Sequence, residues 1–372
     1  MRNKITINYL ALFFIIPFSG FYITVLPLSP IYFFVLFGIL LSIFILLIKS
    51  SIKNSLEIYL SFLILLYFSI SQQIFFIPNI STYVNFNFSI VVFIVSYVIL
   101  YKTNSNTIIN ISEKLIYFSL PLLMFEAYYR YTHPISGDIY IEKGREDLLF
   151  YIYKMNSVMY QDSNFVGIFI LCLFFFLLYI KQFGEKKYYI SFSLLIILTF
   201  ATLSRASIIS LVFFSILYLA RKKIYKYRYL VTIITVISIT LLFPILIEYK
   251  NFDESFATRF HIFDNMMLYL SNTDLISLFF GAGFGNSVDV LNRGAHNFFM
   301  TYLVESGIIG TALIIIFWSR ILYITKFKAG IIMFPFLLNG LAFASGAIPY
   351  LYAIFAITIV LESRRIGKCK IN

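Results

Sequence analysis

Apolar stretches alternate with short polar segments along almost the whole chain. About twelve of these stretches approach or reach the roughly 17–25 residues with which an α-helix crosses a bilayer. They run at 5–22, 30–48, 57–77, 84–101, 115–129, 164–180, 188–203, 206–220, 230–248, 297–319, 329–345 and 347–362. No internal repeat, Ser/Pro-rich linker or low-complexity tract interrupts them. The pattern therefore predicts an all-α integral membrane protein, folded as a single polytopic domain over residues 1–372.

Composition also indicates a membrane protein. Of the 372 residues, 60% are apolar and 12% are charged, whereas soluble domains carry about 25% charged residues. Residues 1–26 resemble a signal peptide, but no small-residue cleavage site follows, so we expect an uncleaved signal anchor. Cys172 lies in an apolar run and Cys369 in the basic tail, a separation that predicts neither a disulfide nor a metal site.

The net charge of +12 follows the predicted topology. Most of the 29 lysines and arginines fall on alternate connections between spans, including the run RKKIYKYR at 221–228. Because cytoplasmic connections retain positive residues, both chain ends should lie in the cytoplasm, as in a multi-pass protein of the cell (inner) membrane. Two larger outer loops remain, at about 130–163 and 249–295. Because the predicted topology accounts for most of the positive charge, we expect no nucleic-acid partner.

One predicted hairpin is short. Between Lys187 and Arg221 the chain must cross twice, so each arm is about 25 Å at about 1.5 Å per residue, against a hydrocarbon core of about 30 Å. The turn at Leu203-Ser204-Arg205 should therefore lie slightly below the outer surface. A charge drawn into the membrane is a functional candidate, because its burial is costly without an anionic partner. Snorkelling of Arg205 to headgroup phosphates is the alternative.

The first outer loop follows Glu126, an acid near the end of its span, and is rich in tyrosine. Its part from Arg145 to Tyr160 fits a helix lying on the membrane surface. Tyrosine offers a flat apolar face and a hydroxyl, which match the C–H faces and hydroxyls of sugars. An interfacial aromatic girdle explains the same residues equally well. Glu126, Arg145 and Tyr160 are our candidates for contact with a saccharide substrate.

The second outer loop ends in a glycine-rich segment, GAGFG at 281–285, ahead of an apolar helix. GAGFG lacks the spacing and the βαβ context of a nucleotide-binding turn, so we interpret it as a turn into a re-entrant or outer segment. His133, His261 and His296 all fall on the outer side, but no HxxxH or HExxH spacing joins them. We therefore expect neither a metal site nor a cofactor.

The apolar helix after the glycine turn carries one acid, Glu305, and the small residues Gly307 and Gly310. Glu305 lies on roughly the opposite helix face from His296, so it is not a direct partner of that imidazole. It should pair with a charge on another span or hold the helix through a hydrogen bond. The glycines predict close packing between helices.

Taken in order, these pieces resemble the signature of the O-antigen ligase and O-antigen polymerase superfamily. His296-Asn297, followed by nine residues and GIIGT, resembles the family's histidine motif, and TLSRAS around Arg205 resembles its T-x-S-R-small motif. ATRFHIFDNMM around Arg259 resembles the arginine-led motif upstream of the glycine turn, and QDSNFVG, with Asn164, is similar to the start of the span after the first outer loop. Ala206 stands where glycine is usual, and Phe263 near where tryptophan is often found, which leaves the subfamily open.

The resemblance implies a metal-independent glycosyltransferase of the membrane-embedded C type (GT-C). Its donor would be an oligosaccharide on undecaprenyl diphosphate, held in membrane lipid. Charge grows on the diphosphate as the sugar leaves, and the guanidinium groups of Arg205 and Arg259, with Arg293 as a weaker third, would stabilise it. His296, whose ordinary pKa is about 6.5, would accept the proton of the acceptor hydroxyl. The neighbouring Asn297 is a further substrate-binding candidate.

Polymerase and ligase differ in their acceptor. A polymerase passes the growing O-antigen or capsular chain to another lipid-linked repeat unit, whereas a ligase passes it to the lipid A core. We favour the polymerase by analogy with its more divergent branch, and a chain-length regulator is then a further partner. A transporter for the same lipid is a second alternative, which predicts broken helices, repeated halves and buried charges along a path.

Overall fold

The computed structural model describes residues 2–18, 30–48, 55–74, 79–136, 152–159, 162–184, 186–226, 254–292, 297–341 and 348–369. Within these ranges the chain is helical and contains no strand. Helices long and apolar enough to cross a membrane are α2 (Pro30–Ile48), α3 (Leu56–Ile74), α4 (Ile80–Tyr101), α5 (Ser105–Thr132), α7 (Ser163–Ile180) and α14 (Phe298–Ile324). The prediction of a helical membrane protein is confirmed at this level, and the count of twelve spans stays a prediction.

Other helices overlap the remaining predicted spans without meeting the same criteria of length and composition. They are α1 (Arg2–Phe18), α8 (Tyr189–Ala201), α9 (Arg205–Lys226), α15 (Gly330–Gly340) and α16 (Pro349–Cys369). The predicted span at 230–248 lies outside the described residues. The second predicted outer loop contains α11 (Glu254–Asn272), α12 (Leu275–Phe280) and α13 (Ser287–Leu291), so much of it is helical.

The centre of the bundle is formed by α4, α7 and α16, whose apolar side chains are buried on nearly all faces. α16 packs along α4, and α7 packs against α8, α9 and α15. The peripheral helices α2 and α3 instead expose large apolar side chains such as Leu40, Leu47 and Leu66. Surfaces of this kind are unfavourable in water and suit contact with lipid tails.

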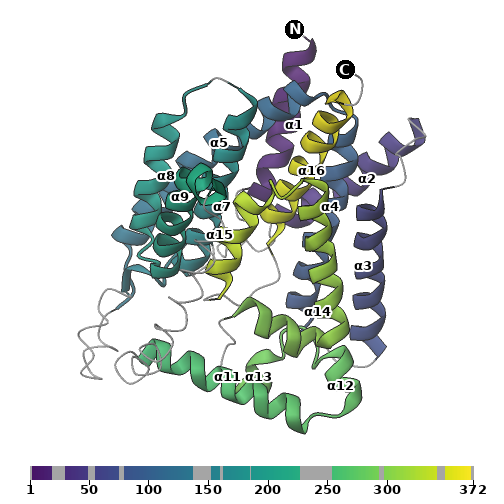
Figure 1. Ribbon diagram of the computed structural model, residues 1–372, viewed down its shortest axis with the longest axis vertical. Helices are drawn as coiled ribbons and strands as arrows, with labels where there is room; N and C mark the ends of the chain where they lie inside the picture. The colour runs from purple at the N-terminus through teal and green to yellow at the C-terminus, as the bar shows by residue number, and fades with distance from the viewer. Residues whose placement is uncertain are drawn as a thin grey trace.

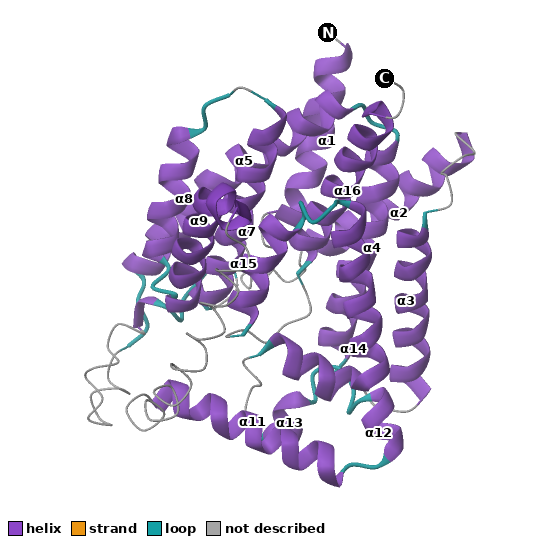
Figure 2. Cartoon of the chain, viewed as in Figure 1, coloured by secondary structure: helices purple, strands orange, loops and turns teal. Residues whose placement is uncertain are grey.

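Two ends of the bundle differ in structure (Figure 1). α1 begins and α16 ends at one end, the terminal end, while α11, α12 and α13 lie across the opposite one, the distal end. Figure 2 shows that helices make up nearly all of the described chain between them. The turn between α8 and α9 and the start of α7 face the distal end. α11, which carries the candidate Arg259, and the turn that precedes Arg205 both lie toward the distal end (Figure 1).

Ion pairs and carbonyl contacts tie the helices together toward the terminal end. Arg320 of α14 donates to Glu57 of α3 at 3.0 Å, and Lys328 donates to Glu362 of α16 at 2.8 Å. Arg364 donates to the carbonyl oxygens at the end of α4, with 2.7 Å to that of Tyr101. Basic residues predicted to set topology therefore also fix helix ends to one another.

Candidate functional site

The distal part of the molecule is organised by an interruption in α14. Gly307 has φ 65° and ψ −172°, so the helix stops and restarts there. Carbonyls just before such a break lose their helical donors. The backbone N–H groups of Ala282 and Gly283 replace them, donating to Val304 O at 2.7 Å and to Glu305 O at 3.1 Å. Backbone polar groups freed within a membrane-spanning segment must be satisfied by protein, and the turn after α12 does so.

Glycine is required on both sides of this contact. A Cβ at Gly307 would lie 2.4 Å from the carbonyl oxygen of Phe279, and one at Gly281 would lie 2.5 Å from the backbone of Glu305. Both glycines also have positive φ, which other residues rarely adopt. The close packing predicted for Gly307 is present, against Phe279 and Gly281, although the backbone of Gly307 is not helical. Gly310 also packs closely, against Ser306 and Phe68.

Glu305 holds the glycine turn through hydrogen bonds. Ser287 Oγ donates to Glu305 Oε1 at 2.7 Å, and the backbone N–H groups of Gly285 and Ser287 also donate to this carboxylate. Gln72 of α3 accepts from Phe284 N at 2.8 Å on the other side of the turn. Of the two roles expected for Glu305, the structure shows the hydrogen bond.

The α8–α9 turn lies where the short hairpin predicted it. α8 ends at Ala201, α9 begins at Arg205, and Leu203 between them has φ 55°. The carbonyl of Thr202 accepts from Ser163 Oγ at 2.7 Å, which fixes the turn to the start of α7. The side chain of Arg205 is exposed at the first position of α9.

A buried arginine that sequence reasoning missed braces this turn. Arg130 of α5 is completely buried, and its Nε donates to Glu126 Oε1 at 2.9 Å. Its remaining nitrogens donate to Tyr153 O at 2.6 Å and to Ala201 O at 2.8 Å. The contacts of Arg130 therefore join the segment 152–159 to the end of α8. Glu126, a predicted substrate residue, has in Arg130 a partner that accounts for its burial.

Lys154 adds a second buried cation beside the turn. It is 5% exposed, and its carbonyl accepts from Ser163 N at 2.9 Å. Burial lowers the pKa of the Lys154 ammonium; Asp162 opposes this shift, and the positive charges of Arg205 and Arg130 add to it. The charge of Arg205 therefore lies near those of Lys154 and Arg130, in a group that also contains the acids Asp162 and Glu126. Nothing in the sequence pattern distinguishes Lys154, since its burial depends on segments distant along the chain.

The two candidate asparagines have local structural roles. Asn297 is the N-cap of α14, and its Oδ1 accepts from Phe299 N at 3.0 Å and Met300 N at 3.2 Å. Asn164 donates through Nδ2 to Asp162, the N-cap of α7, at 3.1 Å. Such caps satisfy N–H groups that a helix start leaves without partners. These contacts explain both residues without a substrate, and their predicted substrate contacts stay predictions.

Arg259 lies exposed on α11, a helix anchored to the rest of the distal end. Ile262 and Met266 of α11 are buried in a small apolar cluster with Leu291 of α13 and Val304 of α14. The four other candidates, Arg145, Tyr160, Arg293 and His296, lie outside the described residues. The predicted grouping of Arg205, Arg259 and His296 therefore stays a prediction. Of the surface helix expected from Arg145 to Tyr160, residues 152–153 form a 3-10 turn and 154–159 are not helical, so the prediction is wrong for 154–159, and the rest lies outside the described residues.

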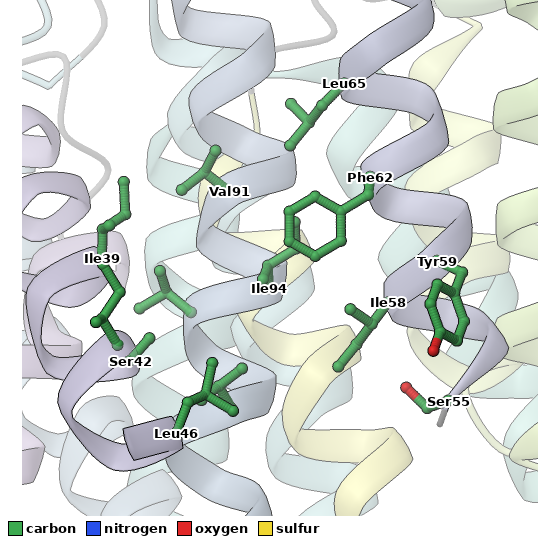
Figure 3. A pocket seen from close by; sticks show the side chains of 13 residues that line it. Ile39, Ser42, Leu46, Ser55, Ile58, Tyr59, Phe62, Leu65, Val91 and Ile94 are labelled. Atoms are coloured by element: carbon green, nitrogen blue, oxygen red, sulfur yellow. The ribbon is translucent and has the colours of Figure 1, made fainter. Parts of the chain in front are cut away.

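An apolar groove of about 410 Å³ lies between α2, α3 and α4 (Figure 3). Its lining includes Ile39, Leu46, Phe62 and Val91, and Ser42, Ser55 and Tyr59 are its polar members. The lining, as far as its residues are described, suits a hydrocarbon chain and contains no charged group. We interpret it as a lipid-facing groove and place the candidate chemistry at the distal end.

Comparison with known proteins adds no relative. The chain matches no family model, no curated protein and no solved structure. The resemblance to the O-antigen polymerase and ligase superfamily therefore rests on the motifs around Arg205, Arg259 and His296 alone.

Proposed function

We propose that this protein is a polysaccharide polymerase that transfers an oligosaccharide from undecaprenyl diphosphate to a second lipid-linked repeat unit. One observation supports the proposal: the turn before α9, which begins at Arg205, and α11, which carries Arg259, both lie toward the distal end of the bundle, and α14, which begins just after His296 in the sequence, packs against α11 (Figure 1). In the proposed topology this end faces outward from the cell (inner) membrane. The product is an O-antigen or a capsular polysaccharide.

Positive charge at the distal end suits the leaving group of this reaction. As the bond between the anomeric carbon and the diphosphate oxygen breaks, negative charge grows on the diphosphate. Arg205 is exposed at the start of α9, so a diphosphate bound there would meet its guanidinium and the positive end of a helix dipole, with the buried charge of Lys154 nearby. Arg259, and more weakly Arg293, complete the set. Preorganised donors of this kind are typically worth about 3–4 kcal/mol each in rate.

The acceptor hydroxyl loses its proton as it attacks the anomeric carbon. In the proposed mechanism the imidazole of His296 takes that proton, because it is largely neutral at pH 7 with an ordinary pKa of about 6.5. Proton and sugar transfer then balance: the acceptor gains the glycan, His296 gains the proton, and undecaprenyl diphosphate leaves. Asn297 fixes the start of α14 directly after His296.

Complementation distinguishes the acceptors. The full-length chain is expressed in two strains derived from the cells that naturally carry it, one lacking the polymerase and one lacking the ligase. A polymerase restores long chains in the first strain only. Restoration of glycan on lipid A core in the second strain alone identifies a ligase. Failure in both, with the protein present in the membrane, contradicts either activity.

A transporter for the same lipid is the second candidate, because α14 is interrupted and broken helices are typical of transporter sites. In this protein, however, the carbonyls freed at the break bond to the turn after α12 rather than lining a path. Proteoliposomes test the alternative: movement of a fluorescent lipid-linked oligosaccharide across the bilayer, without chain growth, would favour transport.

A further inference from the structure

A cleft of about 430 Å³ opens between α11 and α13 at the distal end. Its volume lies within the range of small-ligand sites, about 300–1,000 Å³. Its polar lining consists of Asn265, Tyr269, Asn272, Thr273 and Asn292, with two apolar side chains beside them. None of these lining residues is among those to which the proposed transfer chemistry was assigned.

The walls of the cleft are held in place from both sides. Asn265 donates through Nδ2 to Leu291 O at 2.9 Å, which joins α11 to the end of α13. Asn292 ends α13 in the left-handed conformation, with φ 58°. At its other end α13 begins at Ser287, whose hydroxyl is bonded to Glu305. A ligand in this cleft would therefore meet preorganised side chains, which lowers the entropy lost on binding.

One lining group lacks a partner. The hydroxyl oxygen of Tyr269 is buried and makes no hydrogen bond within the described part of the chain. A buried hydroxyl without a partner is costly, and a bound group that donates or accepts would relieve that cost. Tyr269 also offers a ring face, to which the C–H groups of a sugar can pack.

The chemistry of the lining selects the class of ligand. Among the described residues, 254–292 and 297–341 included, the lining contains no lysine, arginine or histidine to hold a phosphate and no carboxylate to hold a cation. Amides and hydroxyls both donate and accept, so they match a neutral ligand rich in hydroxyl groups. We infer that this cleft is a glycan subsite, which binds a neutral sugar residue of the saccharide chain. Its place in polymer synthesis rests on the proposed function; its affinity for sugar does not.

Binding of free saccharide tests the subsite without any transfer reaction. The full-length protein in nanodiscs is titrated with the lipid-free repeat-unit oligosaccharide, released by mild acid from the lipid-linked repeat units of the cells that carry the chain. Saturation-transfer NMR and calorimetry report binding. Tyr269→Phe removes the hydroxyl alone and Asn272→Ala removes one amide, and each should weaken affinity about tenfold. Ser271→Ala is the matched control, since Ser271 lies on the same helix outside the lining and bonds to its own helix at Leu268 O.

Two comparisons separate the subsite from the proposed function. Arg205→Ala should abolish chain growth while leaving the oligosaccharide affinity unchanged. If wild-type protein binds and Tyr269→Phe does not, but no polymer forms in complementation, the subsite stands and the polymerase proposal fails. If polymer forms while Tyr269→Phe and Asn272→Ala bind like wild type, or if wild-type protein binds no oligosaccharide, the subsite is overturned. Melting temperatures within about 2 °C of wild type establish that the variants are folded.

Discussion

The Arg130 guanidinium and the Glu126 carboxylate form a buried ion pair one turn apart on α5, with Nε 2.9 Å from Oε1. Arg130 also donates to Tyr153 O and Ala201 O, on two segments distant along the chain. The pair therefore supports the loop at 152–159 and the turn that carries Arg205. Its position accounts for two charges that a membrane bundle would otherwise exclude.

Removing one partner of this pair should destabilise the protein strongly. Arg130→Met leaves the Glu126 carboxylate buried without a partner, and breaking such a pair typically costs about 3–5 kcal/mol. Glu126→Gln should cost less, because Arg130 keeps its two carbonyl acceptors. Thermal unfolding in detergent measures the order of the two variants. A Glu126→Gln variant less stable than Arg130→Met would show that the carbonyl contacts contribute little.

Gly307→Ala should disrupt the distal end. An added Cβ meets the Phe279 carbonyl at 2.4 Å, and the positive φ of Gly307 is strained for alanine. The strain alone is on the order of 1–3 kcal/mol, and the clash adds to it. Gly184→Ala is the matched control, since a Cβ there meets no atom within 4 Å. Equal melting temperatures for the two variants would contradict the close approach described between α12 and α14.

Lys154 should make stability depend on pH in the alkaline range. Its pKa in the folded protein is lowered from an ordinary value of 10.5, so the folded state gives up this proton before the unfolded state does. The cost of burying the charge is fully present below the folded pKa and is relieved as pH rises toward 10.5. Lys154→Met should therefore melt higher than wild type at pH 7, and the difference should shrink toward pH 10. A constant difference would show that the charge is not its cause.

Arg259→Lys should impair chain growth although charge is conserved. A guanidinium binds two phosphate oxygens with its planar fork, whereas an ammonium is a point charge. Polysaccharide length in complemented cells measures the effect, with protein level checked in the membrane. Wild-type chain lengths with Arg259→Lys would show that the role of Arg259 is simple charge pairing.

Arg205→Ala should abolish chain growth, and Arg221→Ala, at the other end of α9, is its control.

Hydrophobic periodicity was enough to predict most helices and one turn. The α8–α9 turn was predicted because two crossings had to fit between Lys187 and Arg221, a constraint of length that needs no tertiary information. The N-cap role of Asn297 was not predicted, although the local preference of asparagine for helix starts would have indicated it. Features of this kind depend on neighbours in sequence.

The features that sequence missed depend on contacts between distant segments. Arg130 looked like the first residue of a loop, and its burial requires Ala201 from another helix pair. The sequence predicted close packing at Gly307 but not the helix break, because a glycine in an apolar run fits a continuous helix and an interrupted helix equally well. The φ of Gly307 is set by the backbone of Phe279 to Gly281, which no local pattern reports.

The break at Gly307 divides α14 into a short segment, residues 298–306, and a longer segment, residues 308–324, which bind to different parts of the protein. The short segment is bound to the turn after α12, because Ala282 and Gly283 donate backbone hydrogen bonds to its last carbonyls. Its Glu305 side chain also accepts a hydrogen bond from Ser287, at the start of α13. The longer segment is instead joined to α3 by the ion pair between Arg320 and Glu57. Any tilt of α11, α12 and α13 relative to the bundle would therefore carry residues 298–306 with it, and the change in direction would fall at Gly307.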